Sequence, residues 1–563
     1  MKTILYHSNN SRAFTGFGKH AKNILRYLQK TGKYKLVELA NGVPWDADIN
    51  NSKPWTCQGS LPSDPNIVHQ INQNPTRARI AGYGGEMIDH AIKTYKPDIY
   101  IGVEDIWGFD GYWDKPWWNK INHMIWTTLD SQPLLEQAVT AAPKTKNYFV
   151  WSSFAERDMA KLGHEHVKTL HGSVNTDDFY RLSDIERFNL RKRFNIHDKY
   201  VVGFVFRNQL RKSVPNLLDG FKTFKKDCPQ AKLLLHTHYS EGWDIPRLLK
   251  EKGINNTDIL TTYFCKHCKS YDIRPFTGQE QDCPICGSKK TVNTTNISNG
   301  VDETQLNEIY NLMDVYCHPF TSGGMEIPIF EAKLTELVTL VTNYSCGEDS
   351  CTSESGGLPL EWAEYREPGT QFIKASTYAS SIAKQLKKVF SMKRSKVKEM
   401  GARARQFTLD NYSIDVIGKK LEGILDAMPS IDYDFDWDKE NQQGKIMLED
   451  EIDTEKSIAV VIPGAASDVL WINSILDDFK KLYEEYSIYI FTEPRFYDYI
   501  EDHPAVHKVL PYSPQIDNPM FLEGNSSNKG YFDMAFFPHY WTQRFNHYNH
   551  NEKDKDQFKL CLI

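Results

Sequence analysis

The feature that most constrains the fold of this chain is an alternation of apolar runs with helical patterns. In the first 195 residues, four continuous apolar runs are separated by segments such as the helix-like KHAKNILRYLQK. These runs are ILYHS (4–8), DIYIGVED (98–105), HMIWTTLD (123–130) and NYFVWSS (147–153). Because buried strands separated by helices are typical of a covered parallel sheet, we predict such a sheet here.

The same alternation begins again at YVVGFVF, near Lys199. It continues through AKLLLHTH (231–238), an apolar run at 312–317, LVTLVTN (337–343), QFIKAS (371–376) and a closing helix at 402–428. We therefore predict an α/β fold with two Rossmann-like domains, over 1–196 and 197–428, that face a cleft. Ligands of such sheets bind beyond the carboxyl ends of the strands.

A third, smaller α/β unit is predicted at the end of the chain. Residues 429–455 are acidic and lack core patterning, so they are interpreted as a linker. The segment 456–563 then contains IAVVIPG, YSIYIFTE, VHKVLPYS and FDMAFFPHY, four strand-like runs. This pattern indicates a half-size α/β domain.

Composition excludes some classes of protein. The 563 residues are 40% hydrophobic and 25% charged, as in an ordinary soluble globular protein. No apolar stretch reaches 18 residues, and Met1 runs directly into a strand-like segment. We therefore expect neither a membrane span nor a signal peptide, and a cytoplasmic location. The formal charge of −6 gives no global support for a nucleic-acid partner.

Four of the ten cysteines have the spacing of metal ligands. They form the pattern C-x2-C-x14-C-x2-C inside an insert at 261–293, and they are Cys265, Cys268, Cys283 and Cys286. Four thiolates at this spacing are typical of a tetrahedral structural zinc site. The alternative, unmetallated thiols, leaves a short insert with little to hold it together. We predict a zinc ribbon whose metal is structural.

A glycine-rich loop and two cations indicate a site for a phosphorylated ligand. In SGGMEIPIFEAKLTE, Gly323 and Gly324 lead into a helical pattern, and a helix start offers free N–H groups to phosphate. Arg207 and Lys212 follow a strand and could hold a diphosphate without a metal. The alternatives are an ordinary strand–loop–helix unit and a solvated basic loop.

Several of these segments resemble one family. FVFRNQLRKS resembles the G-R-x4-K loop of retaining GT-B glycosyltransferases of family 4, with Phe206 in place of the glycine. SGGMEIPIFEAKLTE is similar to the E-x7-E segment of that family, and TGFGKHAKNIL to its N-terminal glycine loop. WSSFAERDMAKLG with LHGSVNTDDFY resembles the interdomain stretch, and 402–428 the closing helix. The resemblance covers residues 1–428 in family order.

The resemblance implies roles for individual residues. Arg207 and Lys212 would bind the donor diphosphate, and Glu331 the nucleotide ribose. The backbone of the glycine loops would face the donor, at Gly16, Gly18, Gly323, Gly324 and Met325. No catalytic metal is expected, because the two cations would stabilise the leaving group.

Two departures from the family pattern concern the reacting centre. The first Glu of E-x7-E falls on Gly323, and the nearest carboxylate, Glu326, comes three residues later. The family's His is replaced by Asp130, our candidate for activating the acceptor; the alternative is a helix-capping aspartate. His171, Glu104 and Asp105 are weaker candidates for lining the cleft.

The C-terminal unit resembles the N-terminal half of family 9 heptosyltransferases. The resemblance lies in AVVIPGAASDVLWINSILDDF, in which Asp468 would lie near an acceptor. No donor-binding half follows in this sequence. We interpret the unit as an accessory, acceptor-binding or assembly module through which the chain could oligomerise.

The resemblance implies transfer of a sugar from a nucleotide-sugar donor to an acceptor hydroxyl, with retention. The combination of SGG-x-EIP with a zinc insert resembles glycosyltransferases of large tailed phages. This makes a hydroxymethylated base in phage DNA one candidate acceptor, in the host cytoplasm. A glycan or protein acceptor, a non-catalytic sugar- or nucleic-acid-binding scaffold, and an epimerase remain as alternatives.

The DNA hypothesis makes two further predictions from the sequence. Aromatic side chains on the cleft side would stack on a displaced base, at Trp107, Trp113, Trp117 and Trp118. A local basic track would contact phosphates, at Lys19, Arg77, Arg79 and Lys115.

Overall fold

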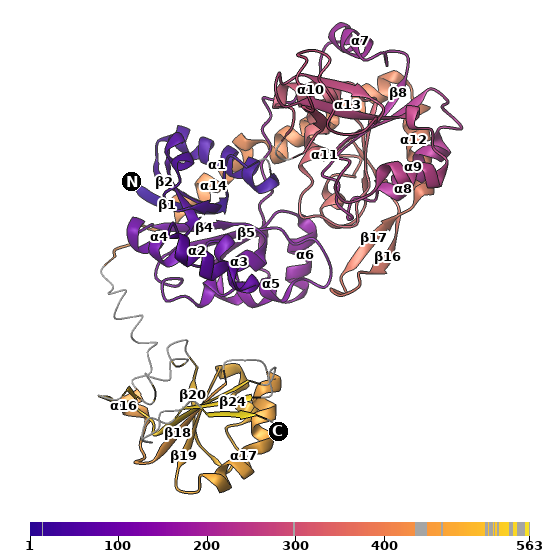
Figure 1. The fold of residues 1–563 in the computed structure, drawn as a ribbon. Helices are drawn as coiled ribbons and strands as arrows, with labels where there is room; N and C mark the ends of the chain where they lie inside the picture. Colours follow the sequence, from indigo (N-terminus) through magenta and orange to yellow (C-terminus); the bar gives the residue numbers. More distant parts are fainter. Residues whose placement is uncertain are drawn as a thin grey trace. The chain divides into compact units, whose positions relative to one another are not determined.

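The computed structural model contains two compact units, Met1–Tyr433 and Asp434–Ile563, each considered by itself (Figure 1). The described residues are 1–13, 15–296, 299–433, 448–462, 466–512, 516, 522, 524–525, 528–539, 544–548 and 558–561. In this part of the chain, no helix is long and apolar enough to cross a bilayer.

The first half of unit Met1–Tyr433 is built on a seven-stranded parallel sheet in the order β3-β2-β1-β4-β5-β6-β7. The strands are β1 (Lys2–Asn9), β2 (Tyr34–Pro44), β3 (Thr56–Leu61), β4 (Ile99–Val103), β5 (Asn122–Thr127), β6 (Asn147–Val150) and β7 (Lys168–Thr169). The predicted apolar runs form β1, β4, β5 and β6. None of these runs corresponds to β2, β3 or β7.

Helix α1 (Gly16–Thr31) begins where the loop after β1 ends. The hydroxyl of Thr15 accepts a hydrogen bond from the N–H of Gly18 and caps the helix, which ends at Gly32 in a left-handed conformation. The start of α1 therefore lies at the carboxyl edge of the sheet. The other helices of this half are α2 (Pro65–Asn72), α3 (Pro75–Gly82), α4 (Ile88–Tyr95), α5 (Glu136–Ala141) and α6 (Ser153–Lys161).

The second half has an eight-stranded sheet in which β8, β9, β10, β13, β14 and β15 run parallel. Strands β11 and β12 add antiparallel to β10. The bounds are β8 (Tyr200–Val205), β9 (Ala231–His236), β10 (Ile259–Cys265), β11 (Tyr271–Arg274), β12 (Val292–Thr294), β13 (Val315–His318), β14 (Thr339–Thr342) and β15 (Gly357–Leu360). Strand β8 is buried along most of its length, as its apolar sequence predicts.

Helices flank this second sheet. They are α7 (Asp184–Arg193), α8 (Val214–Phe224), α9 (Ile245–Lys252), α10 (Glu303–Asn311), α11 (Ile327–Leu334), α12 (Ala379–Phe390) and α13 (Arg394–Tyr412). The predicted strand QFIKAS is corrected in one respect. It forms β17 (Ile373–Thr377), which pairs antiparallel with β16 (Trp362–Arg366) in a separate hairpin instead of joining the parallel sheet.

The single closing helix predicted over 402–428 is wrong. Ser413 adopts an extended conformation, and its side chain caps a new helix, α14 (Ile414–Ala427). Helix α14 packs on α1, and its buried side chains belong to the core of the first half, as its orange ribbon among indigo elements shows (Figure 1). The chain therefore crosses between the halves twice.

Unit Asp434–Ile563 contains a six-stranded sheet in the order β20-β19-β18-β23-β24-β25. Its elements are α16 (Leu448–Glu451), β18 (Ser457–Ile462), α17 (Ala466–Leu482), β19 (Ser487–Thr492), β20 (Val506–Pro511), β21 (Gly524–Asn525), β22 (Asn528–Lys529), β23 (Met534–His539), β24 (Arg544–Tyr548) and β25 (Phe558–Cys561). The four strand-like runs form β18, β19, β20 and β23. Helix α16 falls within the predicted linker, whose residues 434–447 lie outside the described residues.

Candidate functional site

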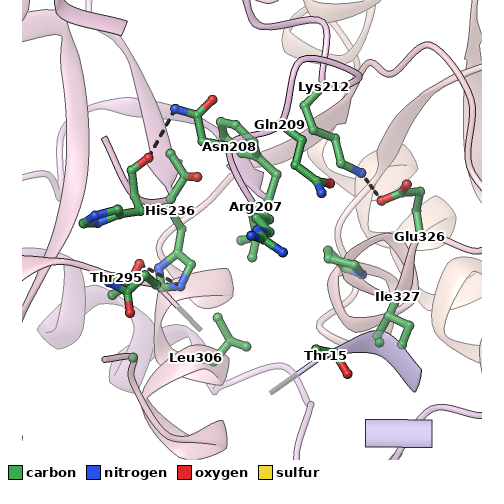
Figure 2. A pocket seen from close by; sticks show the side chains of 18 of the residues that line it. Thr15, Arg207, Asn208, Gln209, Lys212, His236, Thr295, Leu306, Glu326 and Ile327 are labelled. Atoms are coloured by element: carbon green, nitrogen blue, oxygen red, sulfur yellow. Dashed lines mark hydrogen bonds and ion pairs between the residues drawn. The ribbon is translucent and has the colours of Figure 1, made fainter. Parts of the chain in front are cut away.

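A cavity of about 370 Å³ lies where the two halves of unit Met1–Tyr433 meet. The carboxyl ends of β8 and β9 form one wall, and the N-termini of α1 and α11 form the other (Figure 2). The lining includes Thr15, Gly16, Lys19, Phe206, Arg207, Asn208, Gln209, Arg211, Lys212, His236, Thr295, Met325, Glu326, Ile327 and Glu331. The cavity therefore occupies the place expected for a ligand of parallel sheets.

Arg207 points into the middle of this cavity (Figure 2). Its side chain is 52% exposed, and its Nε lies 3.3 Å from a carboxylate oxygen of Glu241. The preceding residue, Phe206, is buried and stacks on Phe204 with ring centroids 4.0 Å apart. The ring of Phe206 thus packs in the core, whereas the guanidinium of Arg207 faces the cavity beside Glu241.

Lys212 is buried opposite Arg207, and its ammonium forms an ion pair with Glu326 (Figure 2). The pKa of Lys212 is lowered to about 8, because burial and the neighbouring Arg211 both disfavour the ammonium charge and outweigh the opposing effect of Glu326. Burial also acts to raise the pKa of Glu326, but Arg211 and Lys212 hold it well below its ordinary value. The buried carboxylate of Glu326 therefore lies between two cations, Arg211 and Lys212.

The carboxylate of Glu326 lies next to Gly323, the position at which the family pattern has its first glutamate. It precedes α11, and His318 Nε2 lies 3.1 Å from its second oxygen. A Cβ built on Gly323 would lie 2.6 Å from Glu326 Oε1. The carboxylate of Glu326 thus fills the space into which a side chain at position 323 would project.

Glu331 lies on α11 and faces the cavity from the same side. One oxygen accepts a hydrogen bond from Tyr310 at 2.7 Å, and the other lies 3.3 Å from Nζ of Lys19. Glu331 raises the pKa of Lys19. Because Lys19 belongs to α1, this ion pair joins the two halves across the cavity.

The predicted glycines have different surroundings. Gly16 lines the cavity, and a Cβ at this position would lie 3.7 Å from Cδ1 of Ile327. Gly18 is packed against the backbone of Asn10 and Ala13 and lies outside the cavity lining. A Cβ on Gly324 would collide with Thr128 of the first half. This glycine therefore permits close contact between the halves.

Met325 lines the cavity and packs against the hydrophobic cores of both halves. It lies against Gly172, at which a Cβ would come within 2.6 Å of the Met325 sulfur. The side chain of Met325 thus belongs to the contact between the halves.

Asp130 lies outside the cavity lining, at the contact between the halves. Its side chain accepts from Ser131 at 2.9 Å and from Ser322, in the loop before α11, at 3.4 Å. Asp105 accepts from Thr128 at 2.7 Å, and burial raises its pKa. Both carboxylates therefore lie near the loop before α11. Asp130 contacts Ser322 of that loop, and Asp105 contacts Thr128, which abuts Gly324.

His171 does not join these groups. Its Nδ1 lies 2.8 Å from the carbonyl oxygen of Trp151, and its ring packs on Tyr412 with centroids 4.4 Å apart. Asp468 lies in the first turn of α17 in the other unit and is buried. The residues 463–465 of its P-G-x-x-x-D loop are outside the described residues.

Several polar residues in or beside this cavity had not been singled out from the sequence, among them His236, Thr295 and Lys374. His236 and Thr295 line the cavity, and burial lowers the pKa of His236 to about 4. Position at the end of the predicted strand AKLLLHTH could have drawn attention to His236, because strand ends meet at the binding edge. Lys374, on the hairpin, lies next to Ser131 and Ser322 and had no comparable signal.

The four cysteines form one cluster whose sulfur atoms all lie within 4.8 Å of one another. The Cys265–Cys286 and Cys268–Cys283 sulfur separations are 3.9 and 3.7 Å. A tetrahedron of Zn–S bonds places sulfurs about 3.8 Å apart. The donor set and its size therefore fit a tetrahedral metal ion.

The two halves of the cluster have matching backbone turns. Lys269 N–H donates to Cys265 O, and Gly287 N–H donates to Cys283 O, both at 2.9 Å. Lys269 and Gly287 both have positive φ, 61° and 70°. Each pair of cysteines thus lies on the same kind of tight turn, which turns its two thiols toward one point.

The expected aromatic stacking surface is corrected. Trp113, Trp117 and Trp118 are buried, the last two completely. The indole of Trp117 donates to Asp89, and that of Trp118 donates to the carbonyl oxygen of Lys144. The rings of Trp117 and Trp118 pack against Tyr100 of β4, with ring centroids 5.3 and 5.9 Å apart.

The predicted basic track is also largely engaged in ion pairs. Lys19 pairs with Glu331, Arg77 with Glu86, and Lys115 with Asp89. Arg79 lies over the ring of Trp107 at 5.8 Å. These contacts leave less positive charge for a phosphate backbone than the sequence suggested.

Glu104 has a testable electrostatic signature. It is buried, accepts from Asn9 and Asn41, and burial raises its pKa to about 8. Between its ordinary pKa and about 8, the folded chain binds more protons than the unfolded chain, so stability falls as pH rises. As the pH rises through this window, we expect the free energy of unfolding of the wild type to fall by ~1 kcal/mol per pH unit relative to that of Glu104→Gln.

Thermal unfolding of both proteins from pH 5 to 8 measures this difference. Glu251→Gln, at a 52% exposed side chain on α9, is the matched control and should follow the wild type. A constant difference between wild type and Glu104→Gln across the range would contradict a raised pKa.

Comparisons with known proteins agree on the fold. No protein-family profile and no curated protein sequence matches this chain. Solved structures do match, and the three described here each cover 76% of the chain. Sucrose-phosphate synthase from Thermosynechococcus elongatus is 13% identical, with a TM-score of 0.53 and 98% of its own chain covered.

Two further structures give the same picture. A glycosyltransferase from Rickettsia africae is 14% identical, with a TM-score of 0.52 and 98% of its chain covered. Anabaena HepE, in complex with UDP and glucose, is 12% identical, with a TM-score of 0.50 and 100% covered. At these identities, the likeness shows an α/β fold with two parallel-sheet Rossmann-like halves, as in GT-B glycosyltransferases.

Proposed function

We propose that this chain is a retaining, family 4-type glycosyltransferase that takes a sugar from a nucleotide-sugar donor. The observation that carries the proposal is one cavity, of about 370 Å³, with Arg207, Lys212, Glu326 and Glu331 in its lining. Its place at the carboxyl edge of a parallel sheet, in a GT-B fold, supports a nucleotide sugar as the ligand.

The two cations would stabilise the negative charge that develops on the departing diphosphate. Arg207 reaches into the cavity, and Lys212 lies in its wall beside Glu326. Fixed positive charges directed at developing negative charge stabilise a transition state, and they need no catalytic metal to do so. Glu331, with one oxygen bonded to Tyr310 and the other beside Lys19, would accept hydrogen bonds from the ribose hydroxyls through its remaining lone pairs.

The sugar would lie beside the loop Gly323–Gly324, near Glu326 and the first-half carboxylates. With retention, the bond from the anomeric carbon to the diphosphate oxygen breaks, and the acceptor oxygen bonds on the same face. The acceptor proton then passes to the departing diphosphate. Asp130 orients the acceptor hydroxyl in this scheme.

Donor hydrolysis without an acceptor tests the proposal most directly. A panel of UDP-, GDP-, TDP- and CMP-sugars is incubated with the chain, and nucleotide release is measured. We expect release from at least one donor, with Arg207→Ala much slower. Binding of a nucleotide without turnover of any donor, alone or with acceptors, would favour the non-catalytic scaffold.

The acceptor is proposed from the resemblance to phage enzymes. A hydroxymethylated base offers a primary alcohol, which suits a reaction that needs only an oriented hydroxyl. The buried tryptophans withdraw one supporting argument, so a displaced base would have to stack elsewhere. The test is labelled-sugar transfer to DNA with hydroxymethylcytosine or hydroxymethyluracil, beside unmodified DNA. No incorporation from an active donor would favour a glycan or protein acceptor.

We propose zinc as the metal of the four-cysteine cluster, which makes the insert a zinc ribbon. All four positions of a tetrahedral ion would be filled by Cys265, Cys268, Cys283 and Cys286. Such a closed site is structural. Zinc would join the turns after β10 and before β12 into one small core. Thiolate ligands and a nucleotide-sugar donor suit the reducing cytoplasm, that of the host if the chain is viral.

The unit Asp434–Ile563 is proposed as a heptosyltransferase-like accessory or assembly module. Truncation after Tyr433 should leave donor hydrolysis within about threefold, because both halves of the cavity belong to Met1–Tyr433. Transfer to the true acceptor should fall. Steady-state kinetics of both reactions measure the difference.

Asp468→Asn is the point-variant companion to the truncation. It should also preserve donor hydrolysis, since Asp468 lies in the other unit. Loss of hydrolysis in Asp468→Asn would show that the catalytic centre lies in the unit of Asp468 and not in Met1–Tyr433. Analytical ultracentrifugation of full-length and truncated chains tests oligomerisation through this module.

A further inference from the structure

A buried lysine from the hairpin joins the two halves of unit Met1–Tyr433. Lys374, on β17, is 7% exposed. Its Nζ donates to Ser131 Oγ at 2.7 Å and to Ser322 Oγ at 2.8 Å. Ser131 follows β5 of the first half, and Ser322 belongs to the glycine loop before α11. One ammonium group thus bridges both sides of the site.

The lysine fixes the direction of two hydroxyl protons. An ammonium group only donates hydrogen bonds, so each serine oxygen accepts from Lys374 and directs its own proton elsewhere. Ser131 Oγ lies 2.9 Å from Asp130 Oδ1, and Ser322 Oγ lies 3.4 Å from Asp130 Oδ2. Both hydroxyls therefore donate to the same carboxylate, one to each oxygen.

The strand that carries Lys374 is itself held on both sides. Ile373 N–H donates to Gln132 O of the first half at 2.6 Å. Ala375 N–H donates to Thr321 O of the glycine loop at 2.9 Å. Since the two neighbours of Lys374 are bonded to different halves, the position of its side chain is fixed by the contact itself.

Packing alone does not account for a lysine at this position. Burial of an ammonium group is unfavourable unless hydrogen bonds replace its hydration. A methionine has similar length and could fill the space without that cost. The charge and the three donors of the ammonium are therefore what distinguishes this residue.

We propose that Lys374 is a positioning residue, which holds Asp130 and the glycine loop in one geometry across the two halves. The inference deepens the proposed function and rests on it for its catalytic part. Lys374 acts through Ser131 and Ser322 and touches neither donor nor acceptor in this arrangement. Its effect is to keep the carboxylate of Asp130 turned toward the glycine loop.

Hydrogen exchange of the full chain tests the positioning without any reaction. In Lys374→Met, amides at 127–132 and 321–325 should exchange at least about tenfold faster than in the wild type. Lys384→Met is the control, because that lysine is 70% exposed on α12. Unchanged exchange in both segments would overturn the proposal. This readout still decides if no nucleotide sugar is turned over, in which case the proposed function alone fails.

Kinetics test the route through Asp130. Lys374→Met should lower kcat about 30-fold or more while the donor KM stays within about threefold. Asp130→Asn should have a similar effect, and the double variant should be no slower than the slower single variant, because both changes remove one arrangement. Lys374→Arg should recover part of kcat. Multiplicative losses in the double variant, or a fully active Lys374→Met, would contradict the inference.

Discussion

Lys212→Met lowers nucleotide-sugar turnover by about 10²- to 10³-fold, the largest effect that we expect of one side chain. Lys212 is a buried cation in the cavity wall, and its loss would remove charge that stabilises the departing diphosphate. Arg207→Ala should also cost about 10²-fold or more. Arg247→Ala, at a 74% exposed side chain on α9, is the matched control and should retain full activity.

Steady-state kinetics with isothermal titration of the free nucleotide separate catalysis from binding. A loss confined to nucleotide affinity, with kcat unchanged, would show that the cations hold the ligand equally before and during the reaction. Strict dependence of turnover on added magnesium or manganese would contradict the role given to Arg207 and Lys212.

The same lysine predicts a pH profile. Because the pKa of Lys212 is lowered to about 8, its charged form is lost as the pH rises through about 8. We expect kcat/KM, which reports the free enzyme, to fall above this pH. Lys212→Arg keeps the charge at all these pH values, so its residual activity should lack the alkaline limb. An identical limb in both proteins would assign it to another group.

We expect Cys283→Ser to abolish zinc binding at the proposed site and to unfold the insert, which is the second large effect. A structural zinc site of four thiolates contributes roughly 10 kcal/mol or more to folding of a small metal-dependent segment. Cys283 is one of four sulfurs that lie within 4.8 Å of one another. Elemental analysis should give one zinc per wild-type chain and none in the variant.

Limited proteolysis locates the change. New cleavage should appear between 265 and 291 in the metal-free protein, while α8 and α12 stay protected. Cys351→Ser is the control, because this thiol lies outside the cluster and bonds Asn343. A Cys283→Ser protein with full zinc content, or a zinc-free wild type with a resistant insert, would contradict the metal site.

Local patterns in the sequence were enough to predict most of the fold. The apolar runs predicted β1, β8, β9 and β13, because a strand buried on both faces needs an uninterrupted apolar segment. The four cysteines were recognisable because metal ligands on tight turns keep a fixed spacing. Arg207 and Lys212 could be placed at the site because parallel strands end at one edge.

Contacts between distant segments could not be predicted in the same way. The carboxylate of Glu326 lies beside Gly323 only because the intervening loop turns it back, and no local pattern indicates that turn. Lys374 reaches Ser131 from 243 residues away, on a hairpin that periodicity placed in the main sheet. Trp113, Trp117 and Trp118 were misassigned because an apolar ring suits a core as well as a ligand surface.

The double crossing of the chain between the halves sets how the cavity can open. The two connecting segments are bonded to each other, with Val174 N–H to Tyr412 O at 2.9 Å and Ile414 N–H to Val174 O at 3.2 Å. Two connections fastened side by side behave as a hinge with one axis instead of a loose tether. We therefore expect any opening of the cavity to be a single rotation that separates Lys19 from Glu331 and Lys374 from Ser131 together, which one pair of fluorescent labels would follow.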